Sequence, residues 1–253
     1  MVDIHSHILS SVDDGSKDMQ MSLEMARIYL ENKVDKVIAT PHFIDGAENS
    51  SLERNKIILA ELRNKLEEEK MNLEVFLGNE VMISPDIIMN LEKEYMATLN
   101  NSRYILMEFP MYDIPLYTHN IIYELQIKGY RPIIAHPERY TSIAENPNLL
   151  FELVEKGALA QLNLPSLEGR YGKKIAKTAR ILIKHNLIHF VSSDAHRNNT
   201  RSPHTENSLN LLKKIVSEED FHLMTQVNGL ALLQDKEIST KPPIQYKKPW
   251  YFI

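Results

Sequence analysis

The sequence predicts an α/β fold, specifically a distorted TIM-like (β/α)7 barrel. Short apolar runs rich in β-branched residues recur along the chain, and longer segments with helical spacing separate them. No low-complexity linker divides the 253 residues, and this length suits one α/β barrel. We therefore expect a single domain over residues 1–253. An open doubly wound sheet is the structural alternative, although the Gly-rich phosphate loop typical of that fold is absent.

The expected strands are seven apolar runs, at 2–5, 34–41, 73–80, 103–109, 131–136, 158–164 and 187–193. Amphipathic segments between them predict helices at about 17–31, 50–69, 115–128, 145–156, 172–186 and 205–217. The clearest is 50–69, where Ser50 and Glu53 have the spacing of a capping box. The tail from Lys241 onward looks extended. We expect its closing aromatic run to pack on the barrel or on a neighbouring subunit.

Composition narrows the function. The formal net charge of −5 disfavours a broad electrostatic contact with nucleic acid or with an anionic membrane. There is no cysteine, which excludes disulfides, Cys-ligated zinc and thiolate catalysis. No segment approaches transmembrane length, and no signal-peptide pattern follows Met1. We expect a cytoplasmic protein with no nucleic-acid partner and no membrane insertion.

Residues able to bind a divalent metal stand at the ends of six predicted strands. They are His5 and His7 with Asp14 in the next loop, then His42, Glu80, Glu108, His136, and finally Asp194 with His196. In a parallel barrel these strand ends meet on one rim. Residues i and i+2 of an extended segment point to the same side, so His5 can bind an ion together with His7. Nine ligands exceed the need of one ion, which predicts a cluster of two or three metals with bridging carboxylates such as Glu80.

The ligand types favour particular metals, because imidazole mixed with carboxylate suits Mn, Fe or Zn better than Ca or Mg. One histidine at a strand end is more often a hydrogen-bonded residue than a ligand, and Asp14 alone could be only a turn residue. We interpret Asp13 as part of a turn and Asn163 as a residue that satisfies backbone groups. Histidines without matching acidic partners are interpreted as structural, namely His119, His185, His189, His204 and His222.

Two arginines belong to loops on the same predicted rim. Arg139 follows His136 by three residues, and Arg201 follows Asp194 by seven. A guanidinium there could bind phosphate oxygens with two parallel hydrogen bonds. The alternative is a salt bridge to a rim carboxylate such as Glu138, and spacing alone does not separate the two interpretations.

The ordered motifs His-x-His, Asp-Asp-Gly, Thr-Pro-His, Gly-Asn-Glu, Glu-Phe-Pro, His-Pro-Glu-Arg and Ser-Asp-Ala-His resemble the polymerase and histidinol phosphatase (PHP) superfamily. More narrowly, the chain is similar to the manganese-dependent tyrosine phosphatases of capsule and exopolysaccharide operons in Gram-positive bacteria. The resemblance runs from residue 1 to about 203. Many members of the wider superfamily carry His where this chain has Asp14 and Glu108. That departure is shared with the tyrosine phosphatase branch and counts against histidinol phosphate as substrate.

The resemblance implies a PHP fold with three divalent ions, Mn by expectation, with Fe, Zn or Mg as alternatives. It also implies that Arg139 and Arg201 bind phosphate as catalytic residues. The implied ligand sets are His5, His7, Glu80 and Asp194 for one ion, Glu80, Glu108 and His136 for a second, and Asp14, His42 and His196 for a third.

The activity implied by the resemblance is hydrolysis of phosphotyrosine on a bacterial tyrosine autokinase that controls polysaccharide export. Activated water would attack phosphorus directly, without a covalent phosphoenzyme. A PHP-type nuclease or a phosphoesterase for small phosphomonoesters is a second hypothesis, although the acidic charge disfavours the nuclease. A third is a non-catalytic module that captures a phosphorylated kinase tail. An amidohydrolase is disfavoured, because its usual bridging lysine has no counterpart at a strand end.

Overall fold

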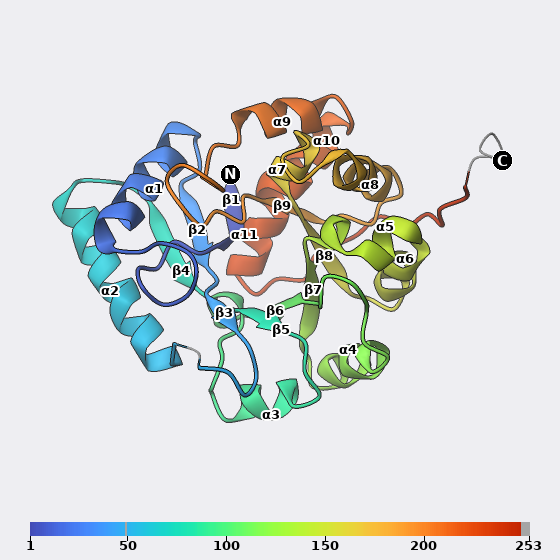
Figure 1. Cartoon of the computed structure of the whole chain (residues 1–253), viewed down its shortest axis with the longest axis horizontal. Coiled ribbons are helices and arrows are strands. Elements are labelled where there is room, and N and C mark those ends of the chain that lie inside the picture. Colours follow the sequence, from blue (N-terminus) through green and yellow to red (C-terminus); the bar gives the residue numbers. More distant parts are fainter. Residues whose placement is uncertain (49, 249–253) are drawn as a thin grey trace.

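The computed structural model describes residues 1–48 and 50–248 and shows an α/β fold in which short parallel strands lie inside a surround of helices (Figure 1). One sheet has the order β1 (Val2–Ser6), β2 (Lys36–Ala39), β4 (Glu74–Leu77). The other has the order β3 (His42–Phe43), β5 (Glu80–Met82), β6 (Tyr104–Glu108), β7 (Arg131–Ala135), β8 (Leu159–Asn163), β9 (Phe190–Ser192). All the strand pairs in both sheets are parallel. The predicted α/β class is confirmed.

Two of the predicted strands are interrupted. The run 34–41 forms β2, and after Thr40 and Pro41 the chain enters β3 in the other sheet. The run 73–80 forms β4, and after Gly78 and Asn79 it enters β5. Proline has no amide hydrogen to donate to a ladder, which helps to explain the first break. An isolated parallel bridge between Ser6 and Ala195 connects β1 to the segment after β9.

Each of the six predicted helices has a counterpart in the structure. They are α1 (Met19–Glu31), α2 (Leu52–Glu68), α4 (Thr118–Ile127), α6 (Asn148–Glu155), α8 (Lys173–Lys184) and α9 (Glu206–Lys213). The sequence analysis did not find the shorter helices α3 (Ile87–Glu92), α5 (Thr141–Glu145), α7 (Leu164–Leu167), α10 (Glu218–His222) and α11 (Asn228–Leu233).

The predicted cap of α2 is one residue out of place. The side chain of Ser51, not Ser50, accepts a hydrogen bond from the amide of Arg54 at 3.2 Å. A capping serine acts in this way on the third residue after it, because the first amides of a helix have no partner within the helix. Asp18 caps α1 similarly by accepting from the amide of Met21 at 2.8 Å.

Burial on both faces fixes the strands in the interior. All five residues of β1, β6 and β8 are buried, as expected when a parallel sheet is covered on both sides. Leu232 of α11 packs in one buried cluster with Val2 and Phe190. No helix in the described ranges is both long enough and apolar enough to cross a membrane.

The tail is held against two helices for as far as the structure describes it. The amide of Ile244 donates to the carbonyl of His185 at 2.8 Å, and Tyr246 exchanges hydrogen bonds with the side chain of Asn148. Residues 241–248 form no helix or strand, in agreement with the prediction of an extended tail. The expected packing of the closing aromatic run concerns residues 249–253, which lie outside the described residues.

Candidate metal centre

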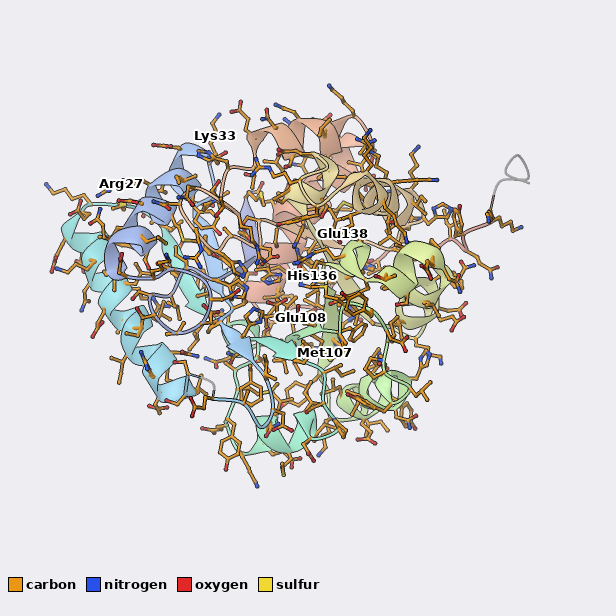
Figure 2. All side chains as sticks on the ribbon, viewed as in Figure 1. Arg27, Lys33, Met107, Glu108, His136 and Glu138 are labelled. Carbon is orange, nitrogen blue, oxygen red and sulfur yellow. The ribbon has the colours of Figure 1, made fainter. Side chains whose placement is uncertain are left out.

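The nine candidate ligands predicted from the sequence lie together at the carboxyl ends of the strands. Glu108 ends β6 and His136 follows β7, and both lie near the middle of the molecule (Figure 2). The side chains form four overlapping groups in which ligand atoms lie within 4.8 Å of one another. The groups are His7, Asp14, His42 and His196; His5, His7 and Glu80; His5, His136 and Asp194; and His42, Glu80 and Glu108.

Glu80 is the carboxylate with the most contacts to histidine. Its Oε2 lies 3.1 Å from His5 Nε2, 3.2 Å from His7 Nε2 and 3.2 Å from His42 Nδ1. Its Oε1 lies 2.8 Å from His136 Nε2. Burial opposes ionisation of Glu80, yet the surrounding imidazoles, His5 foremost, hold its pKa well below the usual value. This arrangement suits a carboxylate that bridges ions.

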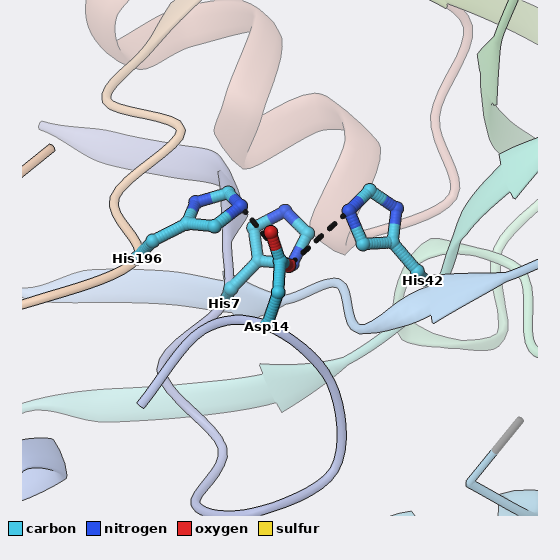
Figure 3. A group of neighbouring side chains, drawn as sticks. All are labelled: His7, Asp14, His42 and His196. Carbon is cyan, nitrogen blue, oxygen red and sulfur yellow. Dashed lines mark ion pairs between the residues drawn. The ribbon is translucent and has the colours of Figure 1, made fainter. Parts of the chain in front are cut away.

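Asp14 lies between two histidines and is therefore more than a turn residue (Figure 3). Its Oδ1 is 3.4 Å from His196 Nε2 and 3.5 Å from His42 Nε2. The ring centroids of His7 and His196 lie 3.8 Å apart, with the two ring planes tilted by 37°. Contacts with His196 and His42 hold the pKa of Asp14 far below its usual value. The carboxylate thus offers an ionised oxygen between two imidazole nitrogens.

Buried polar atoms without partners test whether the residues fit a metal. His136 Nδ1, Asp194 Oδ1 and His196 Nε2 are buried and form no hydrogen bond among the described residues, although Asp194 Oδ1 lies 3.5 Å from His5 Nε2 and His196 Nε2 lies 3.4 Å from Asp14 Oδ1. The Nε2 atoms of His5 and His7 lie 3.3 Å apart, each facing the other. Orphaned lone pairs are costly inside a protein, and a cation would satisfy them. The donor set therefore fits divalent metal ions.

Neighbouring charges shift the titration of the cluster. Burial lowers the pKa of His7, but the carboxylate of Asp13 and the hydrogen bond to it prevail and raise it to about 9. Burial raises the pKa of Glu108 to about 7, and repulsion from Glu80 adds to the effect. A metal must displace such protons from its ligands, so its binding is expected to strengthen as pH rises.

The two predicted arginines lie at the edge of the cluster. Arg139 Nη1 donates to Asp194 Oδ2 at 3.1 Å, and Arg201 Nη2 donates to the same oxygen at 2.7 Å. Their side chains are 19% and 32% exposed, so solvent reaches both. The alternative, a salt bridge to a rim carboxylate, is therefore formed by both arginines, with Asp194 and not with Glu138 as the partner. Glu138 is buried and accepts hydrogen bonds from the amide of Asn163 and the hydroxyl of Ser166.

Three site residues have left-handed backbones. The φ angles are 31° at His136, 50° at Asp194 and 49° at Arg201. Side chains with a Cβ rarely adopt this region, and such strain concentrates at functional sites. His136 directly follows β7, Asp194 lies two residues after the end of β9, and Arg201 belongs to the loop that follows β9.

The sequence did not reveal that Asp13 contacts a candidate ligand as well as forming a turn. Asp13 has the predicted turn contact, since its Oδ1 accepts from the amide of Gly15 at 2.9 Å. Its Oδ2 also lies 2.7 Å from His7 Nδ1 and accepts from the amide of His42 at 3.1 Å. The only sequence signal for this role is the position of Asp13 beside Asp14.

The five histidines interpreted as structural belong to none of the metal-binding groups in the described part of the chain. His185 Nδ1 contacts the carbonyl of Ile181 at 2.7 Å, a local helix contact. His189 Nδ1 accepts from the amide of Ala160 at 3.1 Å.

Together, the parallel α/β fold and the His and carboxylate cluster at the strand ends indicate that this chain belongs to the class of metal-dependent hydrolases. The chain belongs to the CpsB/CapC family of capsular polysaccharide synthesis, whose model matches residues 1–234.

Several relatives cover almost the whole chain. Tyrosine-protein phosphatase YwqE of Bacillus subtilis is 40% identical over 248 residues, which cover 98% of this chain and 97% of that protein. The putative tyrosine-protein phosphatase CapC of Staphylococcus aureus is 40% identical over 255 residues, with 99% of each chain covered. Tyrosine-protein phosphatase CpsB of Streptococcus pneumoniae is 31% identical over 219 residues, covering 85% of this chain and 90% of that one.

Solved structures agree with these relationships. A structure from a study of YwqE of Bacillus subtilis and CpsB of Streptococcus pneumoniae, described as unique metal-dependent tyrosine phosphatases, matches with a TM-score of 0.93 at 40% identity. It covers 98% of this chain and 100% of that chain. A β-aspartyl dipeptidase of Fervidobacterium islandicum shares the fold alone, with a TM-score of 0.51 at 12% identity and coverage of 99% and 84%.

Proposed function

We propose that this protein is a metal-dependent protein-tyrosine phosphatase. The observation that carries the proposal is the convergence of nine His, Asp and Glu side chains, all buried or half-buried except the exposed Asp14, with Arg139 and Arg201 at their edge. Relatives named as tyrosine-protein phosphatases, at up to 40% identity over nearly the full chain, support the same activity.

The ligands are proposed to hold three ions. The group of His7, Asp14, His42 and His196 supports the third ion set expected from the resemblance, with His7 as an additional neighbour. His5, His7 and Glu80 support the first set. For the second set, His136 lies 2.8 Å from Glu80 and 3.6 Å from Glu108. Manganese is the proposed ion, with Fe, Zn or Mg as alternatives, because mixed imidazole and carboxylate ligands suit this range.

Bound divalent ions would supply Lewis acidity, lowering the pKa of water so that it attacks phosphorus and offsetting phosphate charge. Arg139 and Arg201 have a separate role. Each guanidinium now donates to Asp194 Oδ2 and keeps further N–H groups that can donate to the oxygens of a phosphate. Such donors stabilise charge as the transition state forms. A tyrosinate leaving group, with a pKa of about 10, needs little protonation.

The proposed partner is a bacterial tyrosine kinase that carries phosphotyrosine and regulates polysaccharide synthesis. The family description of capsular polysaccharide synthesis supports this context. A distorted seven-unit barrel is also proposed for the fold. Counting β2 with β3 and β4 with β5 leaves seven strand units, and the bridge between Ser6 and Ala195 joins the first to the last.

Substrate comparison tests the proposed function. The metal-loaded protein is expected to release phosphate from a phosphotyrosine peptide faster than from histidinol phosphate, and to leave single-stranded DNA uncut. Faster turnover of histidinol phosphate or cleavage of DNA would favour the phosphoesterase or nuclease hypothesis instead. Tight binding of the phosphopeptide by the metal-loaded protein without phosphate release would favour the non-catalytic binding module.

A further inference from the structure

Strand β8 contributes no candidate ligand, yet two of its side chains connect two candidate ligands of other elements by hydrogen bonds. Gln161 and Asn163 are fully buried and stand two residues apart, so both point to the same side of the strand. Gln161 Oε1 lies 2.9 Å from His5 Nδ1, and Gln161 Nε2 donates to Asn163 Oδ1 at 3.0 Å. Asn163 Nδ2 donates to Asp194 Oδ2 at 2.6 Å. These contacts form an unbroken chain from His5 to Asp194.

The charge of Asp194 sets the direction of this chain. Its Oδ2 also accepts from Arg139 and Arg201, so it is an ionised oxygen that can only accept. Asn163 must therefore turn its NH2 group toward Asp194. Its carbonyl oxygen then faces Gln161.

The same logic fixes the other half of the chain. Gln161 must donate its NH2 group to Asn163, which leaves its carbonyl oxygen facing His5. The proton of a neutral His5 must then reside on Nδ1. In the reverse orientation, the carbonyl oxygen of Asn163 would face an ionised carboxylate oxygen, and two acceptors would repel each other.

We propose that Gln161 and Asn163 are positioning residues that form a directional hydrogen-bond relay from Asp194 and fix the tautomer of His5. The relay leaves the Nε2 lone pair of His5 free, and this atom lies 3.1 Å from Glu80 Oε2 and 3.5 Å from Asp194 Oδ1. Partners of this second-layer type orient metal-binding histidines and raise their basicity. The inference rests on the metal site of the proposed function and identifies two further residues that build it.

The relay lies on a strand whose backbone is paired on both sides. Gln161 pairs with Ala135 of β7 and Phe190 of β9, so its backbone lies inside the larger sheet. The amide of Asn163 donates to Glu138 Oε1 at 3.0 Å, and the hydroxyl of Ser166 donates to the same oxygen at 2.7 Å. The backbone that carries both amide side chains is thus held in place by protein contacts alone.

Gln161→Glu and Asn163→Asp test the direction of the relay while nearly preserving shape. The first keeps an acceptor for His5 but has no NH2 group to donate to Asn163. The second keeps an acceptor for Gln161 but places a carboxylate oxygen against Asp194. Gln126→Glu on α4 and the exposed Asn210→Asp on α9 make the same chemical changes outside the cluster and serve as controls.

Zn²⁺ affinity and stoichiometry, measured by competition with a chromophoric chelator, give a readout independent of activity. In each relay variant two acceptor oxygens face each other, which pushes the relay away from His5 or Asp194. Each variant is therefore expected to bind one ion about 10- to 100-fold more weakly than the wild type, the usual effect of disturbing such a partner. The two controls are expected to match the wild type. In ¹⁵N NMR spectra of the Zn²⁺-loaded wild type, His5 is expected to carry its proton on Nδ1.

Three results would overturn the relay. The first is that both relay variants bind every ion as tightly as the wild type does. If the wild type also binds Zn²⁺ and turns over substrate, this result removes the relay and leaves the proposed function standing. Another is an unprotonated Nδ1 on His5 of the wild type, a measurement that does not depend on the folding of any variant. The last is failure of the wild type to bind Zn²⁺ or Mn²⁺, which would remove the proposed metal site together with the relay.

Discussion

The buried carboxylates of the cluster are compensated by neighbouring cations and hydrogen-bond donors. Glu80 and Asp194 are each 1% exposed, and a buried carboxylate is stable only with cations or hydrogen-bond donors around it. Imidazoles surround Glu80, while two guanidiniums and the side-chain NH2 group of Asn163 contact Asp194. Removing one member leaves a buried charge without its partner, so substitutions in the cluster are expected to weaken metal binding and to lower the stability of the fold.

Glu138 provides a prediction that does not involve metal. Burial raises its pKa to about 7 despite hydrogen bonds from Ser166 and Asn163, whereas an exposed glutamate titrates near 4.5. Between these values the folded chain holds a proton that the unfolded chain releases, so this contribution to stability is lost as pH rises from about 4.5 through about 7. At about 1.4 kcal/mol per pKa unit, the loss is on the order of 3 kcal/mol. Glu138→Gln should remove this dependence.

Urea unfolding of chelator-treated protein at pH 5 and pH 8 measures the effect. Between these two pH values, the free energy of unfolding of the wild type should fall more than that of Glu138→Gln. Glu145→Gln, at a side chain that is 67% exposed on α5, should keep the wild-type dependence. Equal pH dependence in the wild type and Glu138→Gln would contradict the neutral buried carboxyl.

Sequence reasoning reached the residues that have a distinctive type and position. Imidazoles and carboxylates at strand ends are rare enough together to predict their convergence, and the structure brings all nine side chains into the four groups. Their role as ligands remains a proposal. Gln161 and Asn163 could not be found in this way, because neutral amides occur in many strands and only the register of β8 against its neighbours reveals their contacts.

At the scale of elements, the loop after β1 is shaped by a close approach to the strand end. The amide of Ser16 donates to the carbonyl of His7 at 3.0 Å, which folds residues 11–16 back over the cluster. A Cβ on Gly15 would lie 2.3 Å from that carbonyl oxygen and 2.4 Å from His7 Cβ. The loop carries Asp13 and Asp14, so its path determines where two carboxylates lie.

Gly15→Ala is therefore expected to displace the loop and to weaken the binding of one ion by at least about 10-fold, since both Asp14 and the partner of His7 move. Zn²⁺ titration against a chelator measures this. Gly129→Ala is the control, because its φ of 86° strains an alanine while nothing lies within 4 Å of the new Cβ. It should lose about 1 kcal/mol of stability and keep its metal affinity. If Gly15→Ala binds every ion like the wild type, the loop does not depend on this contact.

The sequence predicted the longer elements well and the short ones poorly. Helices such as α2 and α8 have a sustained apolar face, which periodicity detects. Helices such as α10 and α11 have 5 and 6 residues, too few for a periodic signal. The division of two apolar runs between two sheets was also beyond reach, because periodicity does not report which strand pairs with which.

At the scale of the whole molecule, the parallel arrangement concentrates chemistry at one side. Every paired strand runs in the same direction, so the carboxyl ends carry the metal-binding groups while α11 packs near Val2 at the amino end of β1. One side can therefore hold strained backbone and unpaired polar atoms, and the other side supplies apolar packing. The closed barrel and the single domain remain predictions.

Metal dependence of phosphate release is the most direct test of the central claim. The measurement uses a phosphotyrosine peptide and metal-stripped protein, with and without added Mn²⁺. His136→Ala and Arg139→Ala are compared with His185→Ala and Arg27→Ala, of which Arg27 forms an exposed pair with Glu69. Added Mn²⁺ should restore turnover in the wild type and in the two controls. Turnover should fall by about 10²-fold or more in His136→Ala and Arg139→Ala. If no divalent metal restores phosphate release, or if both site variants turn over like the wild type, the account of a metal-dependent phosphatase centre is wrong.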